Sequence, residues 1–271
     1  SNPNHPIINY FRGISAQRTN NHEAALAAFR EVLRVSPNHL QSLLMLGALY
    51  QSKQEYRHAE EFLVRFIRSE PEHLGALRLL GAVHLRLGEP AEAIKVLEPA
   101  LRLAPDDAQV MAALGTAYIS DQQPEKGTEM LEEAARLEPK SANTKTRLAY
   151  QEMAVGDSAQ AVETLRGAID VDPTSTRADL LLIFAHLREM RWDEAIAVSN
   201  RLADKQPDDP VPPNLLGMAY RGKNQNEKAR LHFERSISLN PKYHRAAMNI
   251  AELDTLSGDL KRAVDRYEAI L

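Results

Sequence analysis

The side chains that perform covalent catalysis are missing from this sequence or poorly placed in it. Its 271 residues contain no cysteine, which excludes thiolate catalysis and disulfide bonds. No serine lies in the strained turn that exposes a nucleophile beside a base. Eight of the twelve glycines recur at two fixed places in the repeat, and the glycines form no phosphate-binding loop. We therefore expect no enzyme activity and no cofactor.

The nine histidines and the acidic pairs also lack a catalytic or metal-binding pattern. No two histidines lie three to five residues apart on one expected helix, a spacing typical of zinc sites. His84 and His186 hold the same place in the repeat described below, which explains both without a metal ion. Acidic pairs such as Glu60 and Glu61 lie on expected outer helices, where solvated carboxylates are common. The sequence thus predicts no metal site.

The elements that must position any functional side chain recur every 34 residues. Each repeat carries two blocks of apolar residues at three- and four-residue spacing, which predicts two amphipathic helices. Nine residues after each repeat's proline stands leucine or, once, isoleucine, and the twenty-second residue is always alanine or glycine. The prolines that set this frame are Pro37, Pro71, Pro105, Pro139, Pro173, Pro207 and Pro241. Eight repeats start near residues 6, 40, 74, 108, 142, 176, 210 and 244, and the last is expected to be truncated.

Local signals mark where these helices begin and end. In the third repeat Gly88 turns the chain, and Pro90 opens the second helix at a position where its missing N–H costs nothing. Asp107, Ser175 and Asp209 stand just before first helices and suit N-caps. These signals agree with the boundaries that the proline frame predicts.

A 34-residue period with these columns resembles the tetratricopeptide repeat (TPR) family, and the resemblance covers essentially the whole chain. It implies an all-α fold, namely a right-handed superhelix, or α-solenoid, of helix–turn–helix repeats in a single domain over residues 1–271. It also implies that the first helices line a concave groove through positions 2, 5, 6, 9, 12 and 13 of each repeat.

These groove positions carry arginine and no lysine. Glu252 is their only acid, although the whole chain has a net charge of −4, so charge is segregated by face. The planar guanidinium fork binds carboxylates and phosphates in a bidentate manner. The arginines at these positions are Arg18, Arg78, Arg86, Arg147, Arg177, Arg188, Arg221 and Arg245.

Apolar and amide side chains accompany the arginines, mainly in repeats five to seven. Aromatic residues and methionine are favoured at the centres of interfaces. We predict that this segment grips a partner protein or peptide, whose acidic groups pair with the arginines and whose backbone bonds to the asparagines. The predicted contacts are Arg78, Asn143, Arg147, Tyr150, Met153, Arg177, Leu180, Phe184, Leu187, Arg188, Asn214, Met218, Arg221, Arg245 and Asn249. In the alternative, the arginines pair with acids of adjacent repeats and half of the apolar side chains pack internally.

These features favour a non-catalytic scaffold for protein–protein interaction. The alternative is a regulatory or substrate-recruiting part of a larger enzyme, such as a glycosyltransferase. Chaperone-binding relatives clamp a C-terminal carboxylate with lysine and asparagine at fixed positions, and this pattern is absent. A pI near 6.2 argues against a nucleic-acid partner, whereas an anionic polysaccharide also fits the arginines. No apolar run reaches the roughly 18 residues of a membrane span.

A narrower resemblance concerns the segment from Leu103 to Leu253. It rests on the runs LRLAPDDAQVMAALGTAYIS, DVDPTSTRADLLL and KQPDDPVPPNLLGMAYRGKNQNEKARLHFERSISLNPKY, which resemble TPR lipoproteins of the bacterial PEP-CTERM/exosortase system. Those proteins accompany exopolysaccharide production and surface-protein sorting. The resemblance implies a role in envelope assembly and a periplasmic location at the outer membrane. Without it, a cytoplasmic location is expected.

Overall fold

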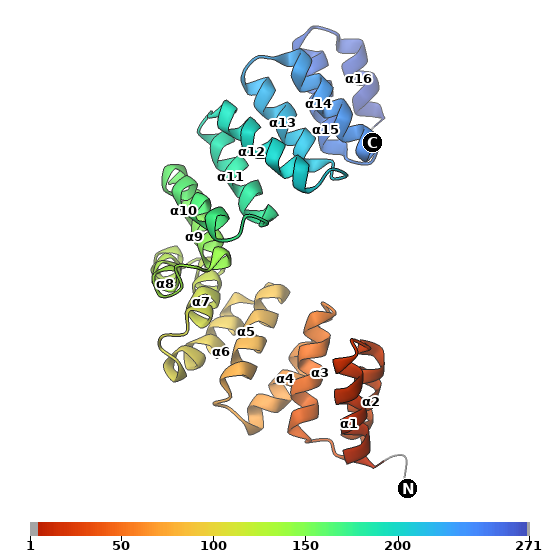
Figure 1. The fold of residues 1–271 in the computed structure, drawn as a ribbon, viewed down its shortest axis with the longest axis vertical. Helices are drawn as coiled ribbons and strands as arrows, with labels where there is room; N and C mark the ends of the chain where they lie inside the picture. Colours follow the sequence, from red (N-terminus) through yellow and green to blue (C-terminus); the bar gives the residue numbers. More distant parts are fainter. Residues whose placement is uncertain (1–4, 270–271) are drawn as a thin grey trace. The chain divides into compact units, whose positions relative to one another are not determined.

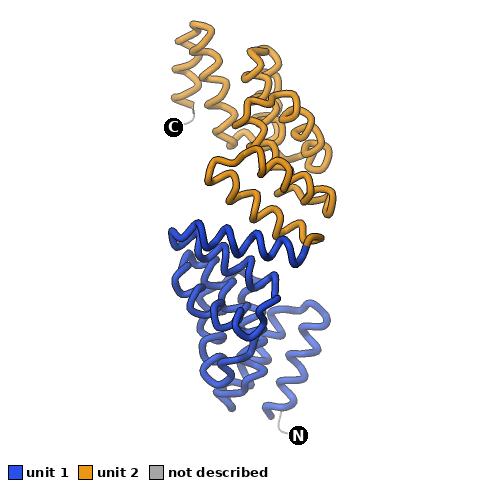
Figure 2. The backbone as a smooth tube through the Cα atoms, turned by 90° about the vertical axis from the view of Figure 1, so that its left-hand side faces the viewer, with its two compact units in different colours: residues 1–138 blue, residues 139–271 orange. Residues whose placement is uncertain are grey.

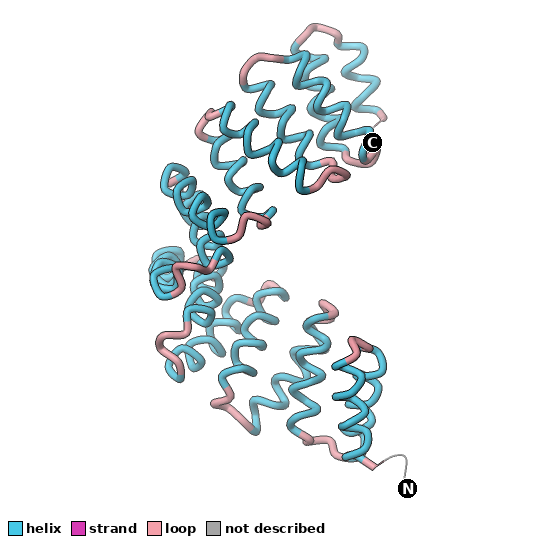
Figure 3. Tube along the Cα trace, in the orientation of Figure 1, coloured by secondary structure: helices cyan, strands magenta, loops and turns pink. Residues whose placement is uncertain are grey.

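The computed structural model describes residues 5–269, and all regular structure in that range is helical (Figures 1 and 3). The helices of the first four repeats are α1 (Pro6–Arg18), α2 (His22–Val35), α3 (Leu40–Ser52), α4 (Tyr56–Ser69), α5 (Leu74–Leu87), α6 (Pro90–Leu103), α7 (Ala108–Ser120) and α8 (Pro124–Leu137). Those of the last four repeats are α9 (Ala142–Ala154), α10 (Ser158–Val171), α11 (Thr176–Arg188), α12 (Trp192–Lys205), α13 (Val211–Gly222), α14 (Asn226–Leu239), α15 (His244–Leu256) and α16 (Leu260–Glu268).

This architecture confirms the all-α solenoid of two-helix repeats. Seven of the eight first helices begin at the predicted residue. The exception is α13, which begins at Val211 because Pro210 takes the N-cap position in a run rich in proline. The predicted truncation of the eighth repeat concerns the chain's end, beyond the described residues.

The chain forms two compact units, Ser1–Glu138 and Pro139–Leu271, which Figure 2 colours separately. The boundary lies between the fourth and fifth repeats. Each unit has its own buried cores: Phe29, Leu46 and Leu63 pack in the first, and Leu165, Ile183 and Leu202 in the second. The single domain over residues 1–271 stays a prediction.

Within a repeat, small residues let the two helices approach closely. A Cβ added to Gly81 of α5 would lie 2.5 Å from Leu97 of α6, so a larger residue would push the helices apart. Ala93 and Leu97 are fully buried, and Leu80 is 2% exposed. Burying each leucine stabilises the fold by about 1.5–3 kcal/mol. The recurring spacing of small and large residues along the sequence is therefore a packing requirement.

The helix ends follow the predicted signals. Gly88 adopts a left-handed conformation with φ of 73° at the end of α5, and Pro90 opens α6. The Asp107 carboxylate accepts hydrogen bonds from two backbone N–H groups at the start of α7. Ser175 caps α11, and Asp209 accepts from the N–H of Val211 at 2.8 Å. The predicted N-cap roles of Asp107 and Ser175 are confirmed. The prediction for Asp209 is wrong, because Pro210 holds the N-cap of α13 and Asp209 stands one residue before it.

One departure from the repeat pattern is a buried acid. Asp179 stands at position 4 of its repeat, where the second, third and fourth repeats carry Leu43, Leu77 and Met111, and its side chain is fully buried. Arg201 and Lys205 of α12 both pair with its carboxylate. Because a buried charge is stable only when it is paired, α11 and α12 are joined here by ion pairs as well as apolar contacts.

Candidate partner-binding surface

Two neighbouring first helices in the second unit carry most of the predicted contacts. Helices α9 and α11 contact each other directly, and the Arg188 guanidinium donates a hydrogen bond to the backbone oxygen of Met153 at 2.6 Å. This bond fixes the end of α11 against the end of α9. We define the α9–α11 face as Asn143, Arg147, Tyr150, Met153, Arg177, Leu180, Phe184, Leu187 and Arg188.

The face exposes two aromatic rings. Tyr150 of α9 is 56% exposed and Phe184 of α11 is 40% exposed, and both hold position 9 of their repeats. Met153, Leu180 and Leu187 are half-buried against the core of the second unit. The face thus offers an aromatic surface on an apolar base, and its residues divide between exposure and internal packing as expected.

The arginines on this face are largely available to a partner. Arg177 and Arg188 are exposed, as is Asn143. Within residues 5–269, no carboxylate forms an ion pair with Arg177 or Arg188. Arg147 is half-buried and interacts within the chain. The face therefore combines exposed cationic groups with exposed rings.

The two asparagines predicted to bind a partner's backbone beyond this face are engaged with each other. The Asn249 side chain of α15 donates to the Asn214 side chain of α13 at 2.8 Å, and Asn214 is only 4% exposed. The Asn214 amide also points to the sulfur of half-buried Met218. In this structure Asn214 and Asn249 join adjacent repeats, and their predicted binding role stays a prediction.

Two of the predicted arginines follow the alternative of internal pairing. Arg221 of α13 pairs with Glu252 of α15. Arg78 lies in the first unit, on α5, and pairs with Asp107 at 3.2 Å. Arg245 is exposed on α15. Among the predicted contacts, those on the α9–α11 face combine exposed arginines with exposed aromatic rings.

The sequence analysis did not predict the hollows that open between successive second helices. One of them measures about 860 Å³ and lies between α6 and α8, over α7. Leu101, Leu114 and Met130 contribute to its apolar lining. On its wall the Tyr118 hydroxyl donates to Glu98 at 2.7 Å. Burial, then this bond, raises the pKa of Tyr118 to about 12, so the phenol stays protonated.

A smaller hollow of about 420 Å³ holds a group that the sequence reasoning missed. Glu60, His84 and Glu89 bring one ligand atom each within 4.8 Å of one another. They are separated by 24 and 5 residues, so no local spacing reveals them. The signal available in the sequence was the repeat frame, which places positions 21, 11 and 16 at one corner between repeats.

Profiles of the tetratricopeptide repeat family match residues 10–62, 74–117, 152–216 and 214–243. These segments carry the same 34-residue frame that the helices follow. The chain is a tetratricopeptide repeat protein. The comparison with curated proteins finds no match.

Solved structures of other TPR proteins share this fold. A TPR protein from Parabacteroides merdae superposes with a TM-score of 0.66 at 17% identity, over 85% of this chain and 91% of that one. MamA from Desulfovibrio magneticus gives 0.58 at 25% identity, over 63% and 96%. YrrB, described as a TPR protein with an unusual peptide-binding site, gives 0.56 at 18% identity, over 68% and 95%.

No helix within residues 5–269 of this TPR protein is both long and apolar enough to cross a bilayer. The described helices are at most 14 residues long, as in α2 and α5. A membrane span needs about 20 residues.

Proposed function

We propose that this TPR protein is a non-catalytic scaffold that binds a protein or peptide through the α9–α11 face. The observation that carries the proposal is the combination of exposed Tyr150 and Phe184 with exposed Arg177 and Arg188. The partner has acidic groups for the arginines and apolar groups for the rings. The fold supports the coarser statement, since TPR proteins commonly mediate protein interactions.

The energetics of this face favour binding. Aromatic side chains supply large contact areas at little cost in conformational entropy. An exposed guanidinium forms a bidentate pair with a carboxylate, and the surrounding contacts then exclude water. Arg188 is already held by the oxygen of Met153, so less of its side-chain entropy is lost on binding. The face is therefore partly preorganised.

A selection from a random peptide library on immobilised protein tests the proposal. We expect enrichment of peptides with Asp or Glu next to aromatic or aliphatic residues. The Arg177→Glu and Arg188→Glu variants should lose these peptides, because each change places a carboxylate opposite the peptide's acids. Circular dichroism should show the same helical signal in both variants.

Arg86→Glu is the matched control for this selection. Arg86 is exposed on α5 and holds position 13 of its repeat, as Arg188 does. It lies on α5 in the first unit, whereas the α9–α11 face belongs to the second unit. Peptide binding that survives in Arg177→Glu and Arg188→Glu, or falls equally in Arg86→Glu, rejects this face as the site.

We propose further that the protein acts in bacterial envelope or exopolysaccharide assembly. The amino-acid sequence of residues 103–253 supports this role, because it resembles lipoproteins of the PEP-CTERM/exosortase system. Fractionation of the native host, with detection by antibody, tests it. Recovery with the periplasm or outer membrane is expected, and exclusive recovery in the cytoplasm contradicts the role.

A further inference from the structure

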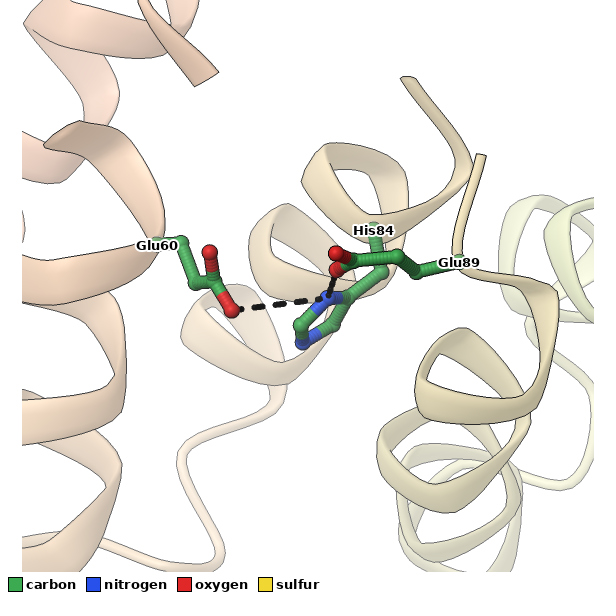
Figure 4. A group of neighbouring side chains, drawn as sticks. All are labelled: Glu60, His84 and Glu89. Atoms are coloured by element: carbon green, nitrogen blue, oxygen red, sulfur yellow. Dashed lines mark hydrogen bonds and ion pairs between the residues drawn. The ribbon is translucent and has the colours of Figure 1, made fainter. Parts of the chain in front are cut away.

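Three side chains from three helical segments meet at the corner between the second and third repeats. Glu60 lies on α4, His84 on α5, and Glu89 at the N-cap of α6. The His84 Nδ1 lies 3.0 Å from Glu89 Oε2 and 4.0 Å from Glu60 Oε1. Figure 4 shows the imidazole between the two carboxylates. These distances place one nitrogen and two oxygens around a common point.

The separations suit a four-coordinate metal ion. Nitrogen and oxygen ligands bind Zn²⁺ at about 2.0–2.2 Å, so ligand atoms around it lie roughly 3.4 Å apart. The distances of 3.0 and 4.0 Å bracket that value. Neutral imidazole and carboxylate are ligands that Zn²⁺ accepts. Small side-chain rotations would therefore complete the geometry.

The orientation of the Glu89 side chain also suits a bound cation. The Glu89 side chain makes no capping hydrogen bond to α6 although it occupies the N-cap position. It turns instead toward the buried ring of His84, which is 5% exposed.

Arg57 holds the two carboxylates from their other side. It contacts Glu60 Oε2 at 3.1 Å and Glu89 Oε1 at 2.6 Å. His84 approaches the remaining oxygens, Glu60 Oε1 and Glu89 Oε2. The guanidinium therefore leaves one oxygen of each carboxylate facing the imidazole. Such outer contacts orient metal ligands in known sites, and Arg57 is a positioning residue here.

The same corner of the sixth repeat provides an internal comparison. His186 holds the position of His84, and it too is buried. The residues that correspond to Glu60 and Glu89 are Val162 and Arg191. The His186 Nδ1 makes no hydrogen bond within the described residues. A histidine at this repeat position is therefore accommodated without two acids beside it, and the two acids are particular to the corner at His84.

We propose that Glu60, His84 and Glu89 bind a divalent transition-metal ion of the Zn²⁺ type. The ion joins α4, α5 and the start of α6 across the boundary between two repeats. Three protein ligands leave one of the four usual positions of Zn²⁺ to water or to a group that enters the adjoining hollow. All three ligands line that hollow, which gives the ion its path of entry.

Calorimetric titration of the tag-free, chelator-treated protein with ZnCl₂ tests the site. One saturable site is expected, with much weaker binding of Mg²⁺, which disfavours nitrogen ligands. Substitution with Co²⁺ should give the visible absorption of a tetrahedral ion. The His84→Tyr variant should fold, because tyrosine stands at this repeat position in Tyr50 and Tyr118.

His84→Tyr and Glu89→Gln should each weaken Zn²⁺ binding by more than the roughly 10- to 100-fold that outer-ligand changes cost. Arg57→Gln should weaken it within that range. His186→Tyr is the matched control and should leave binding unchanged. Absence of saturable Zn²⁺ binding by the wild type, or equal binding by His84→Tyr, overturns the proposal.

Discussion

The second unit presents two pairs of first helices that differ in how their surface groups are used. On α9 and α11, Tyr150 and Phe184 are exposed at position 9, and Arg177 is free of carboxylate partners among the described residues. On α13 and α15, polar side chains of the two helices pair with each other; we call this the closed side, and the α9–α11 face the open side. Arg221 pairs with Glu252, which itself holds position 9 of the eighth repeat.

The position of a residue in its repeat determines the face on which its side chain lies. The residue beside it in the next repeat determines whether that side chain is paired within the protein or exposed to a partner. Asn214 and Asn249 are 35 residues apart, and Arg221 and Glu252 are 31 apart. Both separations along the sequence are close to the 34-residue period, so each pair joins adjacent first helices. In the seventh repeat the position of Glu252 is held by Met218, so the residues next to Arg188 offer no acid at that position. The open and closed surfaces thus follow from a few cross-repeat pairs.

The largest expected effect concerns the exposed rings. Replacing both Tyr150 and Phe184 with alanine should weaken a selected peptide by at least about 2 kcal/mol, since buried aromatic anchors dominate such interfaces. Fluorescence anisotropy with a labelled peptide measures the loss. Folding should change little because both rings are already exposed.

Met248→Ala is the control for the aromatic variant. Met248 is 47% exposed and lies on α15, on the closed side of the comparison. Its removal should leave peptide affinity within experimental error. An equal loss in Met248→Ala would mean that binding is not confined to the open side.

The second-largest expected effect concerns a buried acid on the closed side that joins three helices. Asp254 of α15 is 1% exposed and pairs with Arg230 of α14 and Arg266 of α16. Burial alone would raise the pKa of Asp254, but hydrogen bonds from the two arginines outweigh it and lower the pKa. A lowered folded-state pKa contributes stability that is present above the unfolded value near 3.9 and is lost as the pH falls through the folded value.

Asp254→Asn should therefore cost stability at pH 7 and flatten the acid limb below about pH 4. Removing one partner of a buried pair costs roughly 3–5 kcal/mol, but both arginines are partly exposed, so we expect about 2 kcal/mol. Urea unfolding from pH 2 to 7 measures both effects. In the control Asp193→Asn, an exposed pair with Lys223 is lost, which should cost at most about 1 kcal/mol.

The smallest expected effect comes from a substitution that frees an arginine on the closed side. Glu252→Gln should release Arg221 and strengthen binding of acidic peptides several-fold, within the roughly 0.2–1 kcal/mol that an exposed pair contributes. The same anisotropy assay measures it. A loss of affinity, with Tyr150 and Phe184 intact, would show that Glu252 itself contacts the partner.

The fold was predictable from the sequence because its period is redundant. The leucine spine, exemplified by Leu80, and the small residues such as Gly81 and Ala93 recur in phase with the prolines. Each repeat therefore encodes the same packing of its two helices. The late start of α13 was missed, since a run of three prolines shifts the helix start without changing the period.

The candidate site was predictable only in part. The repeat frame correctly predicts which residues lie on first helices. It therefore places Tyr150, Phe184 and Arg177 on two neighbouring first helices. It does not tell whether Asn214 faces Asn249 or a partner, because that depends on side-chain rotamers across a repeat boundary. The His84 group was missed for a related reason, since its two acids come from different repeats and helices.

A double-mutant cycle between Arg177 and a peptide carboxylate tests the central claim most directly. The affinity of wild-type protein and of Arg177→Gln is measured for a selected acidic peptide and for its amide counterpart, in which Asp or Glu becomes Asn or Gln. Binding at the α9–α11 face predicts a coupling energy of at least about 0.5 kcal/mol between the two changes. Additive effects, with no coupling for Arg177 or for Arg188, would contradict the account.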